Sequence, residues 1–128
     1  MPELPEVETI RCDLAPELTG RVVTDVVIHK PDIVRTPELE AFRSRILGRR
    51  LESVERRAKF LLLRLADGPV LQVQLRMSGR FALGREPPDP EEFRHVAAEF
   101  RLDDGRTLYY DDMRRLGGFW LLDPTAWD

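Results

Sequence analysis

The second residue of the chain is a proline, and two glutamates follow it closely, Glu3 and Glu6. Removal of Met1, common before a small residue, would leave Pro2 with a free secondary amine. Since an α-amino group has a pKa of about 7.7–8.0, a useful fraction of that amine is neutral and nucleophilic near pH 7. Its attack on an aldehyde-like carbon would form an iminium ion, which acidifies the neighbouring C–H bond. A carboxylic acid beside it could protonate a departing oxygen.

The same residues also have a simpler interpretation. Most proteins that begin with Met-Pro-Glu use none of this chemistry, and Glu3 and Glu6 could serve only the positive end of a helix dipole. If Met1 is retained, the Pro2 nitrogen is an amide and cannot attack anything. The N-terminus alone leaves both interpretations open.

Two helices are predicted among the elements that must position these groups. Apolar residues recur at helical spacing over roughly residues 4–14, and Pro16 and Gly20 are expected to end this first helix. A second helix is expected to begin with Thr36 as its N-cap, followed by a proline and a glutamate, and to stop at Gly48.

Most of the remaining chain is predicted to form strands. β-branched residues predict the first strand around residues 22–28. After Gly48 the pattern is that of a β-meander, with Asp-Gly turns at 67–68 and 104–105. The expected fold is one α+β domain over residues 1–128, an antiparallel β-sandwich flanked by an N-terminal helix and a second short helix. The later strands are expected at residues 50–57, 59–65, 70–75, 96–102, 107–111 and 119–122.

Composition excludes several classes of protein. The chain has no apolar run long enough to span a membrane, and its acidic, proline-broken start is neither a signal nor a transit peptide, so a cytoplasmic protein is expected. Cys12 is the only cysteine, which rules out an intrachain disulfide. With only His29 and His95 beside it, no familiar zinc site can form, so no metal and no cofactor are expected in this chain.

Charge is unevenly distributed. The net charge of −3 argues weakly against a nucleic-acid partner, but 11 of the 20 Lys and Arg residues lie between Arg43 and Arg85, with only three acids among them. This segment could make one face attractive to phosphate. It could instead be a solvated surface, because alternating strand residues point to two faces, or an interaction surface for a protein.

Four segments, in order, resemble motifs of the formamidopyrimidine-DNA glycosylase and endonuclease VIII family. Pro-Glu-Leu-Pro-Glu-Val-Glu-Thr at 2–9 is similar to its N-terminal signature. Arg-Arg-Ala-Lys-Phe-Leu-Leu-Leu at 56–63 resembles the strand with its characteristic lysine. Leu-Arg-Met-Ser-Gly-Arg-Phe at 75–81 resembles its Leu-Gly-Met-Ser-Gly loop, and Asp-Met-Arg-Arg-Leu-Gly at 112–117 its Asp-x-Arg-Arg-Phe-Gly loop. Together they are highly specific for the family's N-terminal catalytic domain.

The resemblance implies catalytic roles at four positions. Pro2 would be the nucleophile that attacks C1′ of the damaged nucleotide, and Glu3 the acid that protonates the sugar ring oxygen. Glu6 would support that site. Lys59 would hold a phosphate beside the lesion.

The resemblance also implies a DNA-binding set. Met77, Arg114 and Leu116 would fill the gap left by a flipped-out base, the apolar side chains as a wedge and the guanidinium as a partner for the orphaned base. The implied function is a monomeric base-excision-repair glycosylase with AP-lyase (β,δ-elimination) activity on oxidised bases in double-stranded DNA. The alternative is a non-catalytic domain that binds damaged DNA without cleaving it.

Three departures from the family pattern bear on these roles. Leu116 stands where phenylalanine is usual, which puts the lesion preference in doubt, and Arg76 replaces a glycine. Around His95 only His-Val matches His-Asp-His-Val, so His95 receives no catalytic role. The family's helix–two-turn–helix domain and zinc finger are absent from this chain, so zinc is expected only there. Without them the isolated chain is expected to bind duplex weakly and to be weak or inactive as an enzyme.

Overall fold

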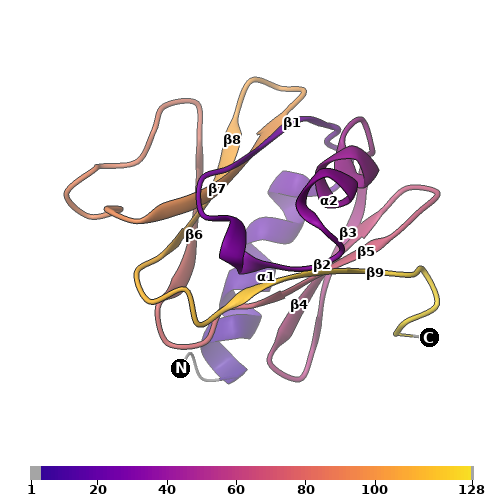
Figure 1. Cartoon of the computed structure of the whole chain (residues 1–128), viewed down its shortest axis with the longest axis horizontal. Coiled ribbons are helices and arrows are strands. Elements are labelled where there is room, and N and C mark those ends of the chain that lie inside the picture. Colours follow the sequence, from indigo (N-terminus) through magenta and orange to yellow (C-terminus); the bar gives the residue numbers. More distant parts are fainter. Residues whose placement is uncertain (1–3, 128) are drawn as a thin grey trace.

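The computed structural model describes residues 4–127 as two β-sheets packed face to face (Figure 1). One sheet has four strands, in the order β1 (Val23–Ile28), β7 (Val96–Leu102), β8 (Thr107–Asp112) and β6 (Gly79–Gly84). The other has five, in the order β2 (Val34–Thr36), β9 (Gly118–Leu122), β5 (Val70–Gln74), β4 (Phe60–Leu65) and β3 (Leu51–Arg57). All neighbouring strands are antiparallel except the parallel pair β2 and β9. The predicted α+β sandwich is confirmed.

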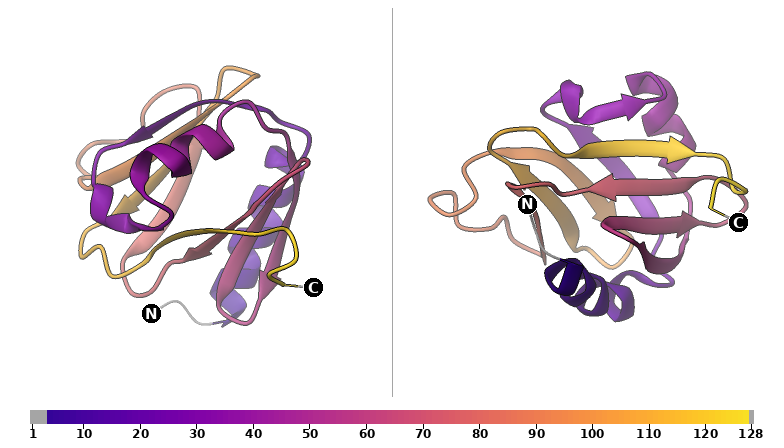
Figure 2. Two further views of the ribbon diagram at one scale, coloured as in Figure 1. Left: turned by 45° about the vertical axis from the view of Figure 1, so that its right-hand side comes forward. Right: turned by 90° about the horizontal axis from the view of Figure 1, so that it is seen from below.

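Two helices lie on opposite sides of this sandwich (Figure 2). Helix α1 (Leu4–Leu18) packs against β3 and β4, whereas α2 (Leu39–Ile46) lies beside β1 and β2. A short 3-10 helix, η1 (Pro31–Ile33), leads into β2. None of the helices in the described part of the chain is long and apolar enough to cross a membrane.

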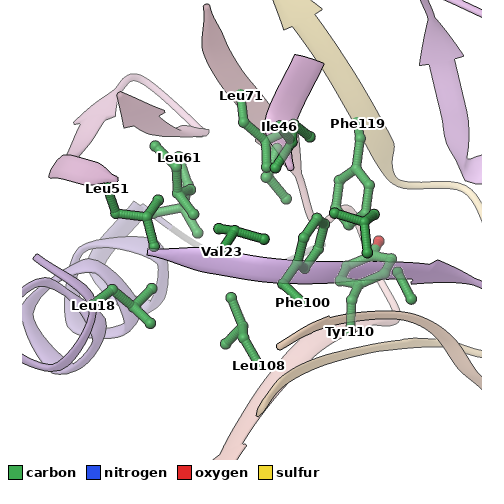
Figure 3. Close-up of a cluster of buried hydrophobic side chains, with 14 of the residues drawn as sticks. Leu18, Val23, Ile46, Leu51, Leu61, Leu71, Phe100, Leu108, Tyr110 and Phe119 are labelled. Atoms are coloured by element: carbon green, nitrogen blue, oxygen red, sulfur yellow. The ribbon is translucent and has the colours of Figure 1, made fainter. Parts of the chain in front are cut away.

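Side chains from both sheets fill the space between them (Figure 3). Three aromatic rings meet on one side of this core, where the centroid of Phe119 lies 5.6 Å from that of Phe100 and 4.8 Å from that of Tyr110. Tilted pairs of this kind add about 0.5–1.5 kcal/mol each to the gain from burial. Leu18 anchors the end of α1 on the other side, and it is fully buried.

The first helix runs further than the sequence predicts, because Pro16 does not end it. The proline is exposed and lacks only one backbone N–H, while Leu18 in the following turn is buried in the core and holds that turn against the strands. The chain leaves the helix at Gly20, which has a φ of +89°. Tertiary packing therefore outweighs the local cost of the proline.

The predicted start of the second helix is wrong by two residues. Thr36 is not an N-cap but the last residue of β2, and Glu38 precedes the helix without a side-chain cap hydrogen bond. Pairing of β2 with β9, through Val34 to Phe119 and Thr36 to Trp120, holds this segment extended. The predicted stop at Gly48 is confirmed, with a φ of +83°.

The six strands predicted after Gly48 are all present, with ends that differ by one residue at most. Strands β2 and β6 were not predicted individually. β6 begins at Gly79, directly after the turn that contains Met77, and pairs with β8 from Gly79 opposite Asp112 to Gly84 opposite Thr107. This pairing brings two of the motifs to the same end of the sandwich.

Candidate nucleic-acid interface

The four motif segments converge on one end of the molecule, the lower end in Figure 1 and in the left view of Figure 2. The start of α1, the β3–β4 turn, the β5–β6 turn and the β8–β9 loop all lie there. Pro2 and Glu3 are outside the described residues. Glu6 is exposed in the first turn of α1. The fold therefore brings together the described parts of four motifs that lie far apart in the sequence.

Ion pairs connect the start of α1 to the β3–β4 turn that contains Lys59. The carboxylate of Glu8 accepts hydrogen bonds from Arg11, at 2.7 Å, and from Arg56 of β3, at 2.9 Å. The same Arg56 donates through Nη1 to the carbonyl oxygen of Ala58, at 2.9 Å. These two guanidinium groups, Arg11 foremost, lower the pKa of Glu8 to about 2. The helix start and the lysine turn are thus positioned relative to each other.

Lys59 lies in the tight turn between the paired residues Arg57 and Phe60. Ala58 takes the left-handed conformation that closes this turn, with a φ of +52°. Acids near it pair with other cations, Glu8 with Arg56 for example. Within residues 4–127 no carboxylate forms an ion pair with Lys59, whose side chain is half-buried.

Hydrogen bonds join the β5–β6 turn to the β8–β9 loop. The hydroxyl of Ser78 donates to Asp112 Oδ1, at 2.5 Å, and accepts from the backbone N–H of Arg114, at 3.2 Å. Nη1 of Arg114 lies 3.9 Å from the sulfur of Met77. The predicted wedge methionine and the predicted base-pairing arginine therefore stand side by side.

Asp112 is the centre of this arrangement, and it was not singled out from the sequence. Its fully buried carboxylate also accepts from the Tyr110 hydroxyl, at 2.7 Å, and from the backbone N–H groups of Arg115 and Gly117, at 2.9 and 3.2 Å. Burial, with the neighbouring Asp112 carboxylate, raises the pKa of Tyr110 well above its usual range. A sequence signal existed: an aspartate at a strand end, just before a turn, often accepts from following backbone N–H groups.

Two glycines make room for the tyrosine in this network. A Cβ at Gly117 would overlap the carbonyl oxygen of Gln74 and lie 2.6 Å from the Tyr110 hydroxyl. A Cβ at Gly79 would lie 2.7 Å from the same hydroxyl. The glycines of both motifs are therefore needed for close approach, because no side chain fits where Tyr110 reaches Asp112.

The apolar side chains at this end are unusually exposed. Among the described residues four large hydrophobic side chains are exposed, and three of them lie here: Met77 at 59%, Met113 at 56% and Leu116 at 43%. Exposed apolar groups gathered in one place mark an interaction site rather than a core. Met77 and Leu116 were expected as wedges, whereas Met113 was not foreseen because it occupies the variable position of its motif.

Arginines border this apolar group. Arg114 and Arg76 are both exposed. Arg76 has a φ of +57°, the left-handed region that favours glycine, which accounts for the glycine usual at this position of the motif. The substitution therefore keeps the turn and adds a guanidinium beside Met77.

Much of the charge in the basic segment is used inside the fold, so that segment is not one uniform phosphate-binding face. Arg43 donates to the carbonyl oxygen of Val26, and Arg49 donates to that of Ala66. Arg64 pairs with Glu55 at 2.9 Å. Only the part of the segment near the β3–β4 and β5–β6 turns faces the interface.

His95 is held through its backbone. Its N–H donates to Asp111 Oδ1, at 2.7 Å, and its carbonyl oxygen accepts from Asp112, at 3.0 Å. These contacts fix the backbone at His95 and do not involve its imidazole ring. No group of three or more His, Cys, Asp or Glu side chains that could hold a metal occurs in residues 4–127.

Comparison with known proteins agrees with this geometry. The family model of the formamidopyrimidine-DNA glycosylase N-terminal domain matches residues 1–119. The formamidopyrimidine-DNA glycosylase of Pelotomaculum thermopropionicum is 42% identical over all of this chain and 46% of its own length. That of Symbiobacterium thermophilum is 45% identical over 97% of this chain and 40% of its own length.

Solved structures give the same result. The Lactococcus lactis Fpg in complex with DNA containing an abasic site superimposes with a TM-score of 0.88 at 28% identity, over 97% of this chain and 45% of that one. A complex of that enzyme with Fapy-dG-containing DNA superimposes with a TM-score of 0.87. This chain thus spans less than half the length of these relatives. It belongs to the formamidopyrimidine-DNA glycosylase family, whose N-terminal domain it matches over residues 1–119.

Proposed function

We propose that this chain is the catalytic domain of a monomeric base-excision-repair glycosylase that acts on oxidised bases in double-stranded DNA, and that Pro2 is its nucleophile. One observation carries the proposal. Met77, Arg114 and Leu116 are exposed on two hydrogen-bonded loops at the end of the molecule where α1, and with it the motif at residues 2–9, begins.

The exposed residues fit the gap in a DNA duplex from which one base has been everted. Met77 and Leu116 would wedge apart the neighbouring base pairs, offsetting part of the few kcal/mol that unstacking costs. The Arg114 guanidinium, beside Met77, would donate to the base left without a partner. Leu116 offers less stacking area than an aromatic ring, so apolar filling would dominate.

The chemistry proposed for Pro2 joins base removal to strand cleavage. The neutral amine attacks C1′, forming a C–N bond as the glycosidic bond to the damaged base breaks. Glu3 protonates the ring oxygen, and the opened sugar becomes an iminium ion. Loss of a C2′ proton then expels the 3′ phosphate, and a second elimination expels the 5′ phosphate. Lys59 would hold a phosphate beside this site, and Glu6 would support it.

Borohydride trapping tests the proposal on the full-length protein. Reduction of the iminium ion should fix the protein covalently to duplex DNA that contains an abasic site or an oxidised base. Intact mass must first show that Met1 is absent. The Pro2→Gly variant keeps an amine and should form some adduct with much lower turnover. A form that retains Met1 should form none, since its Pro2 nitrogen is an amide.

A second function, damage binding without catalysis, is favoured by one observation. The exposed set of Met77, Arg114 and Leu116 is complete without the N-terminal residues. Lesion-dependent gel shifts with neither adduct nor strand cleavage, from protein that lacks Met1, would support this function and exclude the catalytic one.

A further inference from the structure

Arg35 of β2 reaches the back of the β8–β9 loop from a distant part of the chain. Its Nη2 donates to the carbonyl oxygens of Gly117, at 2.6 Å, and Arg115, at 3.0 Å, and lies 3.5 Å from that of Leu116. One guanidinium nitrogen therefore faces three consecutive carbonyl groups of the loop that carries Arg114.

The segment around Arg35 packs closely against this loop. A Cβ at Gly118 would lie 2.5 Å from Nε of Arg35 and 2.9 Å from the carbonyl oxygen of Ile33, so glycine lets the two segments come close. Asp32 of η1 accepts a hydrogen bond from Nε of Arg115, at 2.8 Å. The parallel pairing of β2 with β9 determines which residues of the loop Arg35 and Asp32 can contact.

The backbone of the loop is thereby held from two sides. Asp112 accepts from the N–H groups of Arg115 and Gly117, and Arg35 donates to the carbonyl oxygens of the same two residues. Arg115 takes a left-handed conformation, with a φ of +52°, that these contacts stabilise. The side chains of Arg114 and Leu116 remain exposed. The loop thus presents the exposed side chains of Arg114 and Leu116 on a fixed backbone.

We propose that Arg35 is a positioning residue that holds the β8–β9 loop in its DNA-inserting conformation before DNA arrives. This inference rests on the proposed function, because insertion into a damaged duplex is what the fixed loop would serve. A loop that is already ordered loses less conformational freedom on binding, and preorganisation of this kind raises affinity without a new contact.

The competing role for Arg35 is a direct contact to phosphate, since the residue is exposed overall. The two roles make different predictions. Loss of a phosphate contact weakens binding to every duplex and reduces the salt slope by about one unit. Loss of a positioning residue weakens binding only where the loop inserts, and leaves the salt slope unchanged.

The test compares Arg35→Met with Arg35→Lys in this chain. Amide hydrogen exchange in the free protein measures how well residues 113–117 are held, and binding is measured to a duplex with an abasic-site analogue and to its undamaged counterpart. Exchange at Arg115 and Gly117 should accelerate at least about tenfold in Arg35→Met. Preference for the damaged duplex should fall about tenfold, equivalent to about 1.4 kcal/mol, while binding to the undamaged duplex stays within about twofold.

Two further variants keep the test sharp. Arg35→Lys retains the charge but lacks the planar guanidinium, so it should fall between wild type and Arg35→Met. Arg101→Met removes an exposed arginine near the far end of β7 and should change neither measurement.

Unchanged exchange in Arg35→Met, or equal losses on both duplexes, would overturn the positioning role. If the wild type shows no preference for damaged DNA, the proposed function fails, and the exchange rates alone then decide whether Arg35 fixes the loop. Thermal unfolding of each variant shows that the comparison is made between folded proteins.

Discussion

The carboxylate of Asp112 accepts hydrogen bonds from four donors, and these donors belong to three different segments of the interface. Ser78 lies in the β5–β6 turn, Tyr110 in β8, and the two backbone N–H groups in the β8–β9 loop. A buried charge of this kind is tolerated because every side of it meets a donor. The residue therefore serves stability and loop geometry at once.

Replacement of Asp112 by asparagine should destabilise the fold by about 2–3 kcal/mol, because an amide cannot accept from all four donors and leaves buried N–H or O–H groups unpaired. Urea unfolding measures this change. The control is Asp103→Asn, which alters an exposed aspartate paired with Arg21 at 3.6 Å and should cost less than about 0.5 kcal/mol. Equal effects of the two substitutions would contradict the central role of Asp112.

Glu8 predicts a pH dependence. Its folded-state pKa of about 2 is below the ordinary value of 4.5, so the carboxylate stabilises the fold fully above pH 4.5. This contribution is lost as the pH falls from 4.5 towards 2, where the folded protein must also take up the proton. Melting temperatures measured across this range should fall less steeply for Glu8→Gln than for the wild type.

The matched control for that measurement is Glu38→Gln. It removes the same charge from an exposed residue that makes no cap hydrogen bond at the start of α2. Its acid profile should follow the wild type. A Glu8→Gln profile that also followed the wild type would show that the ion pairs with Arg11 and Arg56 do not couple the helix to β3.

At the scale of elements, the interface depends on how closely β6, β8 and the β8–β9 loop approach one another. Gly117→Ala should destabilise the protein by more than about 2 kcal/mol, since the added Cβ overlaps backbone and meets the Tyr110 hydroxyl. It should also lower the preference for damaged DNA. Gly84→Ala is the control, because its Cβ would meet only the carbonyl oxygen of Glu86, at 3.7 Å. A stable Gly117→Ala protein with unchanged preference would contradict this account.

Local sequence patterns predicted the helices and strands that depend mainly on their own residues. Short strand-like runs between turn residues located six of the seven strands after Gly48 to within a residue, and helical spacing located α1. It failed at Thr36, where a parallel partner more than eighty residues away holds the chain extended, and at Pro16, where burial of Leu18 carries the helix onward. Both errors come from tertiary contacts that a sequence window does not contain.

The residues of the candidate site also differ in whether local sequence could predict them. Lys59, Met77, Arg114 and Leu116 could be proposed from the sequence because their motifs are contiguous, and the turns and the loop that carry them lie at one end of the molecule. Asp112 and Arg35 were missed because they act through hydrogen bonds to segments elsewhere in the chain. Motifs therefore identified side chains that face outward, whereas the residues that orient them required the structure.

For the whole molecule, affinity for DNA should be limited by charge. The net charge is −3, and many arginines are bonded to carbonyl groups or acids of the fold. Near the interface the exposed or half-buried cations are few, among them Arg57, Lys59, Arg76 and Arg114. Since nonspecific affinity grows with the number of phosphates neutralised, this chain should bind undamaged duplex weakly and rely on gap filling at a lesion.

Salt dependence tests this balance. With three or four phosphate contacts, the logarithm of the binding constant for damaged duplex should fall with the logarithm of salt concentration at a slope between about −2.7 and −3.6. Lys59→Ala should reduce the slope by about 0.9, one phosphate's worth, and should weaken binding to damaged and undamaged duplex by the same factor. Fluorescence anisotropy over a range of salt concentrations measures both quantities.

Arg101→Ala is the control, because it removes the same charge from the far end of β7, beside Asp25 and Glu99. It should leave the slope unchanged, since long-range attraction is screened within about 10 Å at ordinary ionic strength. If Arg101→Ala and Lys59→Ala reduce the slope equally, the salt dependence would reflect the net charge of the whole molecule and not a local phosphate contact. A contact at the β3–β4 turn requires that only Lys59→Ala does so.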